Sequence, residues 1–220
     1  IYASSSSVYG IKKEKNVTED MKLEPLTDYS RFKGECEKIL NSYKSNDFIT
    51  TTIRPSTVCG YGKRQRLDLV VNILTNHAYH NREIKVFGGD QLRPNLHIED
   101  YCSAIECLIK APSNKIKDQI FNVGYQNLSI AEIANKVKKV VEEYFPDKDP
   151  IEIETTPSDD NRSYHINSDK IKDELGFEPQ HTIEEAIIEM CEAFKKGKLP
   201  NSFENDNYFN VKKMQNLEVS

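Results

Sequence analysis

The sequence predicts a protein of the α/β class, and three observations support this prediction. Short runs rich in β-branched and other apolar residues recur along the 220 residues. Segments with apolar residues at helical spacing lie between these runs, and capping sequences mark the start of several segments. Strands that alternate with helices in this way are typical of a sheet whose strands are connected by helices.

Four segments have the composition of strands. They are 48–53 (FITTTI), 84–87 (IKVF), 119–123 (QIFNV) and 151–155 (IEIET). The last alternates apolar and polar residues, so we expect it to be half exposed. Residues 1–4 resemble the end of a buried strand, and for this reason we expect the chain to be a fragment of a longer protein.

Five helices are expected, and each has a predicted start or stop signal. They begin at Asp28, Glu99, the capping box of Ser129 and Glu132, Ser168, and the capping box of Thr182 and Glu185. We expect the first to run to about Tyr43, the second to Lys110, the fourth to Gly176 and the last to Gly197. From about Pro200 the chain is polar and rich in Asn, which predicts a loosely ordered tail.

The composition argues against several classes of function. The net charge of -5 disfavours a nucleic-acid-binding protein. No apolar run approaches the length of a membrane span and no signal-like segment opens the chain, so we expect no membrane partner and a cytoplasmic location. The five cysteines fit no zinc or disulfide pattern and are expected to be buried free thiols. His77 and His80 lack a third ligand nearby in sequence, so we predict no metal site.

Tyr29 and Lys33 are the first candidates for chemistry. Their spacing of four residues places both on one face of a helix, one turn apart. A phenol is a poor base with an ordinary pKa of about 10, and a nearby ammonium favours the phenolate. Such a pair can act as an acid/base near neutral pH. Taken alone, such a pair is more often an ordinary surface pair.

The surroundings of this pair favour a site. The segment SSSSVYG (4–10) directly follows the first apolar strand, and RPSTVCG (54–60) follows the strand at 48–53. Open α/β sheets bind ligands at the carboxyl ends of their strands. A serine at such an end can hydrogen-bond the substrate oxygen that Tyr29 deprotonates. Two loops and one helix face can therefore converge on one cleft.

Five motifs follow one another in the order typical of a known family. They are SSSSVYG at 4–10, YSRFK at 29–33, RPSTVCG at 54–60, IKVFGG at 84–89 and RPNLHIEDY at 93–101. This order resembles the extended short-chain dehydrogenase/reductase family, and within it the NAD-dependent nucleotide-sugar epimerases and dehydratases. The resemblance covers nearly the whole chain up to the tail.

The resemblance implies a fold and a division into domains. The fold is α/β, the C-terminal part of a Rossmann-type doubly wound parallel sheet plus a smaller mixed α/β substrate-binding domain. Residues 1–60 would be the last part of the dinucleotide-binding domain, and 61–199 the substrate domain with late sheet elements. Residues 200–220 would be the polar tail. Members begin with a glycine-rich turn that cradles a pyrophosphate, and this sequence contains none. We read Gly88 and Gly89 as a turn, and expect on the order of 100 residues of βα units to be missing.

The resemblance also implies roles for individual residues. Ser5 falls on the catalytic Ser/Thr, Tyr29 on the general acid/base, and Lys33 on the lysine that supports the tyrosine and holds the cofactor ribose. The remaining candidates are Pro55 and Ser56 beside the nicotinamide, and Thr57, Arg93 and Arg162 toward the substrate. Thr57 stands where many members have an asparagine. NAD is the implied cofactor, NADP stays open, and a nucleotide sugar, as in polysaccharide biosynthesis, is the implied substrate.

Ser6 and Ser7 depart from part of the family. The 4,6-dehydratases have acidic residues at these two positions, the related decarboxylases have a glutamate at the second, and the fucose-pathway epimerase/reductases have a cysteine there. Serine performs none of this chemistry well. What remains is hydride transfer with one acid/base, which suits simple 4-epimerisation or a carbonyl/alcohol redox step; we expect the epimerase.

Several alternatives stay open. A nucleotide-sugar reductase or dehydrogenase would use the same residues. An inactive fragment or a binding module is also possible, because we expect the cofactor-binding half to be missing. Family members often form dimers through the tyrosine helix, which allows a homodimer. The basic run 63–66 (KRQR) is either an attractor for an anionic substrate or a turn. At His97 and Asp100 we expect Asp100 to cap a helix rather than to act in catalysis.

Overall fold

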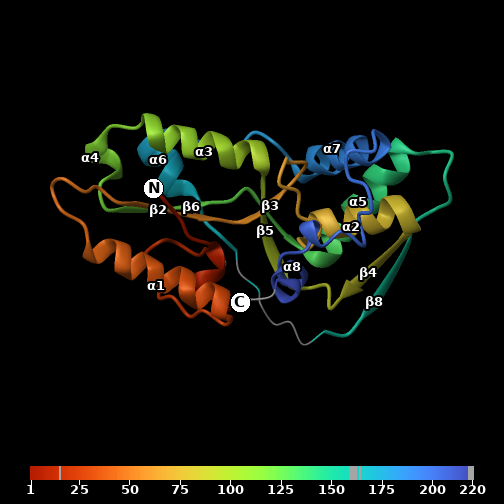
Figure 1. Cartoon of the computed structure of the whole chain (residues 1–220), viewed down its shortest axis with the longest axis horizontal. Helices are drawn as coiled ribbons and strands as arrows, with labels where there is room; N and C mark the ends of the chain where they lie inside the picture. Colours follow the sequence, from red (N-terminus) through yellow and green to blue (C-terminus); the bar gives the residue numbers. More distant parts are fainter. Residues whose placement is uncertain (15, 159–162, 164, 218–220) are drawn as a thin grey trace. The chain divides into compact units, whose positions relative to one another are not determined.

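The protein divides into two compact units, which are described separately here. The structure is a computed structural model that describes residues 1–14, 16–158, 163 and 165–217 (Figure 1). Unit 1 comprises Ile1–Val58, Gln91–Leu128 and Asp160–His181, and unit 2 comprises Cys59–Asp90, Ser129–Asp159 and Thr182–Ser220. Each unit thus combines segments that are distant in sequence. The predicted division at 60 and 199 into consecutive domains stays a prediction.

Unit 1 contains a parallel three-stranded sheet in the order β1-β2-β6. The strands are β1 (Tyr2–Ala3), β2 (Thr51–Pro55) and β6 (Gln119–Val123). Ile53 lies opposite Ala3 on one side and Phe121 on the other. The β6 prediction is confirmed residue for residue, whereas β2 begins three residues later than predicted and ends two later. The predicted α/β class with a parallel sheet is confirmed.

Helices cover both faces of this sheet. Figure 1 shows α1 (Asp28–Ser42) on one side, with α3 (Ile98–Lys110), α4 (Ser113–Ile116) and α6 (Asp169–Leu175) on the other. A core cluster joins sheet residues such as Ile53 and Phe121 to Leu108 of α3 and Ile171 of α6, all essentially inaccessible to solvent. Burial of apolar side chains on both faces is what a doubly wound sheet requires.

A second sheet was not predicted from the sequence. It has the order β3-β5-β7, with β3 (Thr57–Cys59), β5 (Leu92–His97) and β7 (Gln126–Ser129). Two of its strands directly follow motifs of the first sheet: β3 follows β2, and β7 follows β6. The segments after the carboxyl ends of β2 and β6 are thereby held in regular structure.

Unit 2 is built from three packed helices and a two-stranded sheet. The helices are α2 (Val70–Asn81), α5 (Ile130–Tyr144) and α7 (Ile183–Lys195), and each contacts the other two. Strand β4 (Glu83–Phe87) pairs in parallel with β8 (Glu152–Thr156). The predicted strands at 84–87 and 151–155 are therefore confirmed to within one residue.

The helix signals were partly right. Both capping boxes are confirmed: the Ser129 hydroxyl accepts from the Glu132 amide, and the Thr182 hydroxyl accepts from the Glu185 amide. The predicted cap at Asp28 is wrong, because Thr27 accepts from the Ser30 amide and Asp28 is the first helical residue.

Ser168 is confirmed as the N-cap residue of α6, although its hydroxyl makes no cap hydrogen bond and instead accepts from the Gly124 amide at 2.8 Å. The cap predicted for Asp100 is wrong. His97 caps α3, while the buried Asp100 carboxylate accepts from the backbone amides of Gln180 and His181, each at 2.9 Å. Asp100 therefore holds a distant loop against its helix.

The expectation of a loosely ordered tail is wrong for residues 200–217. This segment forms the 3-10 helix η2 (Asp206–Tyr208) and the helix α8 (Asn210–Asn216). The amide of Leu67 donates to the carbonyl of Tyr208 at 2.9 Å, and both side chains belong to one apolar cluster with Phe194. Tyrosine and phenylalanine in an otherwise polar segment provide this anchoring.

The next observations concern the predictions about buried thiols, membrane spans and metal sites. All five cysteines are free, but Cys36 and Cys102 are exposed, so their predicted burial is wrong. Within the described part of the chain, no helix is long and apolar enough to span a bilayer. Those residues also contain no cluster of three or more His, Cys, Asp or Glu side chains suited to a metal ion.

Candidate functional site

Helix α1 presents Tyr29 and Lys33 together. A capping box fixes its start, because the Thr27 hydroxyl accepts from the Ser30 amide at 3.2 Å and the Ser30 hydroxyl accepts from the Thr27 amide at 3.0 Å. Tyr29 then lies in the first turn with 59% of its surface exposed. The Lys33 ammonium lies 5.7 Å from the centre of the Tyr29 ring, which is close enough for a cation–π contact.

Lys33 is also fastened to the first strand. Its ammonium donates to the carbonyl of Ala3, the last residue of β1, at 2.7 Å. The Tyr2 hydroxyl donates back to the Lys33 carbonyl at 3.3 Å. Burial, reinforced by Cys36, raises the pKa of the Tyr2 phenol, which therefore keeps its proton and serves as a donor. The Lys33 side chain is thus held at Ala3, which precedes Ser5 by two residues in the sequence.

Ser5 begins the short 3-10 helix η1 (Ser6–Tyr9), which carries the serine-rich motif. Its hydroxyl accepts from the Ser7 amide at 3.2 Å and lies 2.9 Å from the Ser7 hydroxyl. Ser6 is buried and Ser7 is half-buried. The two positions after Ser5 therefore provide hydroxyl groups and no carboxylate.

The segment after β2 leaves the sheet at the same edge as Ser5. Ala3 and Ile53 lie opposite each other in parallel strands, so Ser5 and Pro55 each follow by two residues. Ser56 is buried, its amide donates to the Val123 carbonyl at 2.7 Å, and its hydroxyl has no hydrogen-bond partner among the described residues. Thr57, half-buried, then opens β3.

The predicted substrate residues are less closely connected to this group. Arg93 lies on β5, half-buried, and its guanidinium donates to the neighbouring Leu92 carbonyl at 3.1 Å. Arg162 lies outside the described residues. The structure therefore brings together Ser5, Lys33 and Tyr29 beside the end of β2, and leaves the roles of Thr57, Arg93 and Arg162 as predictions.

The basic run 63–66 proves to be part of a structured turn. The Arg64 guanidinium donates to the Asn207 carbonyl at 3.2 Å and to Asn210 Oδ1 at 2.9 Å. Arg66 forms an ion pair with Asp68 at 2.9 Å. These contacts all lie within unit 2. They favour the interpretation of this run as a turn over its interpretation as an attractor for an anionic substrate.

One hollow of about 440 Å³ lies elsewhere in unit 1. Its walls include Gly124, Tyr125, His165, Lys172 and Glu178. None of the predicted site residues that the structure describes lines it. Ser5, Tyr29 and Lys33 therefore lie outside this hollow.

A buried ion pair was missed by the sequence analysis. Arg54 and Glu37 form two hydrogen bonds, of 3.0 and 2.6 Å, with only 3% and 7% of their side chains exposed. The available signals were an arginine at the end of an apolar strand and a glutamate one turn after Lys33. Neither signal by itself identifies a partner.

Comparison with known proteins places this arrangement in a family. The family model described as "NAD dependent epimerase/dehydratase family" matches residues 1–124. The chain belongs to this family. The match begins with β1 and extends through both strand-end segments to Gly124, so it includes Ser5, Tyr29 and Lys33.

Individual relatives include epimerases and a dehydratase. A UDP-glucose 4-epimerase of Lactobacillus helveticus is 26% identical over 208 residues, which are 86% of this chain and 61% of the relative. The solved UDP-glucuronic acid 4-epimerase of Bacillus cereus, in complex with UDP-glucuronic acid and NAD, has a TM-score of 0.75 at 24% identity. It is matched over 88% of this chain and 60% of that one.

A dehydratase has a similar fold. The solved dTDP-glucose 4,6-dehydratase of Bacillus anthracis has a TM-score of 0.74 at 24% identity, matched over 96% of this chain and 63% of that chain. At this identity the likeness shows the shared fold alone. The chain spans about three-fifths of the length of these relatives.

The residues present suit one end of an NAD molecule. The exposed Tyr29 phenol and the Lys33 ammonium, which has further N–H groups beyond the one given to Ala3, provide polar contacts for a nicotinamide ribose. Gly88 and Gly89 have positive φ angles of 82° and 131° but lead into β5, not into a helix. They therefore offer no helix N-terminus for a pyrophosphate.

Proposed function

We propose that the protein carrying this chain is an NAD-dependent epimerase that acts on a nucleotide sugar through a transient keto intermediate. The observation that carries the proposal is the grouping of Ser5, Tyr29 and Lys33, with serines rather than acids at positions 6 and 7. This set has one acid/base and two supporting polar groups. It suits the reversible removal of one hydroxyl proton.

The proposed chemistry assigns one task to each residue. Tyr29 takes the proton from a sugar hydroxyl and returns it to the same oxygen later in the cycle. Ser5 hydrogen-bonds that oxygen, and Lys33 stabilises the phenolate form of Tyr29 that takes the proton. When bound, NAD supplies the hydride acceptor and donor. A site that holds the keto sugar by either face would let the carbon be inverted.

The kind of substrate is proposed from the relatives and from the arginines. Curated relatives named UDP-glucose 4-epimerase support a UDP-hexose. Arg93 and Arg162 are proposed to bind its diphosphate, since a guanidinium can contact phosphate through two hydrogen bonds. Pro55 and Ser56 are proposed to border the nicotinamide, and Thr57 to face the substrate.

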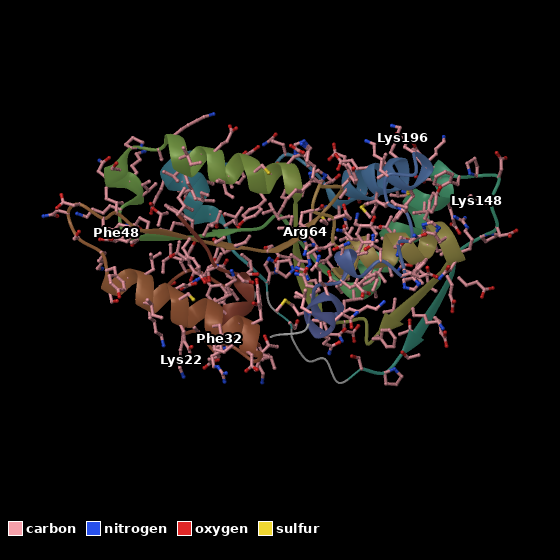
Figure 2. The ribbon with its side chains drawn as sticks, in the orientation of Figure 1. Lys22, Phe32, Phe48, Arg64, Lys148 and Lys196 are labelled. Carbon is pink, nitrogen blue, oxygen red and sulfur yellow. The ribbon has the colours of Figure 1, made fainter. Side chains whose placement is uncertain are left out.

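Two properties of the whole protein are part of this proposal. Two copies are proposed to associate through α1, which exposes Phe32 and Ile39 by 55% and 58%. Figure 2 shows Phe32 at the outer side of this helix. A cytoplasmic location is proposed because the exposed thiols of Cys36 and Cys102 suit a reducing compartment.

A reductase or dehydrogenase is the second candidate, because it would use the same three residues. An epimerase regenerates its cofactor in each cycle, whereas a reductase consumes NAD(P)H. Incubation of the complete protein with UDP-glucose and NAD should therefore invert the sugar without net NADH formation. Stoichiometric formation or loss of NADH would favour the second candidate.

The decisive variant is Tyr29→Phe in the complete protein. Removing the phenolic oxygen removes the acid/base, and we expect turnover to fall by about 10²-fold or more, the scale of general acid–base catalysis. NAD binding should fall far less than turnover, because Lys33 remains and only one polar contact to the ribose is lost. Tyr43→Phe, at the far end of α1, is the matched control and should keep full activity. Near-normal turnover of Tyr29→Phe would refute the assignment.

A further inference from the structure

The missed ion pair between Glu37 and Arg54 has a geometry that calls for explanation. The guanidinium meets the carboxylate through two nearly parallel hydrogen bonds, Nε to Oε1 and Nη2 to Oε2. Both side chains are more than nine-tenths buried. Removing two charges from water is unfavourable, so a buried pair is weak evidence of a gain in stability. A bidentate pair does, however, fix direction and distance strictly.

The pair connects the three segments that carry the acid/base group. Glu37 lies on α1, one turn beyond Lys33, and its carboxylate also accepts from the Ser4 hydroxyl. Ser4 directly precedes Ser5, and its amide donates to the Ile53 carbonyl at 2.8 Å. Arg54 directly precedes Pro55. One carboxylate and one guanidinium thus join the serine loop, the tyrosine helix and the end of β2.

The remaining hydrogen-bonding groups around Arg54 extend this network. Arg54 Nη1 donates to the Tyr9 hydroxyl at 2.8 Å and to the Glu19 carbonyl at 3.1 Å. The Tyr9 hydroxyl donates to Asn122 Oδ1 on β6 at 2.7 Å. Burial raises the pKa of Tyr9 to about 12, although Arg54 opposes this effect, so Tyr9 remains a neutral donor. A buried network whose members are paired in this way specifies a single arrangement.

We propose that Glu37 and Arg54 are positioning residues that hold Ser5, Tyr29 and Lys33 in register with the end of β2. The proposal rests on the proposed function of these three residues. Without the pair, α1 can shift along β1, and Lys33 would then leave the Ala3 carbonyl while Tyr29 moves relative to Ser5. Misplacement by about 1 Å can reduce a rate by about 10²-fold.

The test requires a variant that folds. Glu37→Gln leaves the Arg54 charge buried without its counter-charge, and this change is strongly destabilising. The double variant Glu37→Met/Arg54→Met removes both charges and fills the space with flexible apolar side chains, which is often neutral for stability. Leu108 lies on α3, in the core and outside the network. Leu108→Ala is therefore the control variant, which lowers stability without changing the network.

The first measurement is the steady-state kinetics of the complete protein with NAD and UDP-glucose. We expect kcat of the double variant to fall by at least tenfold while KM stays within threefold. Leu108→Ala should keep the kcat of the wild type per folded molecule. A double variant whose kcat lies within tenfold of wild type, or whose defect is confined to KM, would overturn the positioning role.

The second measurement does not depend on turnover. Amide hydrogen exchange of residues 4–10 and 28–36 should be at least tenfold faster in the double variant, and unchanged in these segments in Leu108→Ala. Unchanged exchange in the double variant would disprove the positioning role whatever the activity. A different outcome would disprove the proposed function instead. In that case the wild-type protein turns over no nucleotide sugar, while the double variant still exchanges residues 4–10 and 28–36 faster than the wild type.

Discussion

Gly124 and Ser56 approach so closely that position 124 has no space for a side chain. A Cβ atom on Gly124 would lie 2.2 Å from Ser56 Oγ and 3.3 Å from Ser56 Cβ. Gly124→Ala must therefore displace the buried Ser56 side chain, and overpacking of this kind costs about 1–3 kcal/mol. We expect urea denaturation to show a decrease of about this size in the free energy of unfolding.

A double-variant comparison tests the cause of this effect. Ser56→Ala removes the atom nearest to the new methyl group, so Gly124→Ala/Ser56→Ala should recover most of the stability relative to Ser56→Ala alone. Equal losses in both backgrounds would show that the clash with Ser56 Oγ is not responsible.

At the scale of single residues, the sequence identified chemical types better than partners. Tyr29, Lys33 and Ser5 were predicted from motifs that follow one another in the order of a family, and the structure places Lys33 beside the Tyr29 ring and the end of β1. Asp100 was expected to cap its own helix, but its carboxylate accepts from amides of residues 180 and 181. Which acceptor a carboxylate satisfies depends on chain segments that lie far away in sequence, and a local pattern contains no information about them.

At the scale of elements, predictions succeeded where local interactions define the element. The helices that start at capping boxes were correct because both partners of the box lie within four residues. Strand β5 was missed because it contains Arg93, Pro94 and Asn95, which are poor strand formers apart from their context. Its partners β3 and β7 lie more than 25 residues away on either side, so tertiary pairing defines the strand.

Helix α7 carries a group that makes stability depend on pH. Cys191 is fully buried in unit 2. Burial raises the pKa of its thiol to about 12 from an ordinary value of 9.0, although Lys148 and Arg82 partly oppose the shift. Between pH 9 and 12 the unfolded chain loses this proton while the folded chain keeps it. The free energy of unfolding should therefore fall as the pH rises through this range, by on the order of 3 kcal/mol.

Cys191→Ala isolates this contribution. Alanine cannot ionise, so the dependence of the unfolding free energy on pH should become flatter between pH 9 and 12, even if the absolute stability is lower. Chemical denaturation at several pH values measures both slopes. Parallel curves for wild type and Cys191→Ala would contradict the argument.

At the scale of the whole molecule, the order of motifs carried more information than any single motif. Residues 4–10, 29–33 and 54–60 are distant in sequence, yet parallel strand pairing brings the first and last to one edge, and Lys33 bonds to the end of β1. The division of the chain into two units could not be predicted from the order of motifs, because each unit combines three segments that are separate in sequence. Contacts between distant segments decide that grouping.

The last prediction concerns the affinity of these 220 residues for NAD. Tyr29, Lys33 and the end of β2 are proposed to contact the nicotinamide end of NAD, and the sequence has no glycine-rich strand-turn-helix segment for its pyrophosphate. Submicromolar affinity requires more than about 8 kcal/mol of binding free energy, and the phosphates usually provide a large part of it through backbone amides. We expect isothermal titration of the 220-residue chain to show no tight NAD binding, with the complete protein as the positive control. A submicromolar dissociation constant for the chain alone would contradict this expectation, and would show that its own residues form a full dinucleotide site.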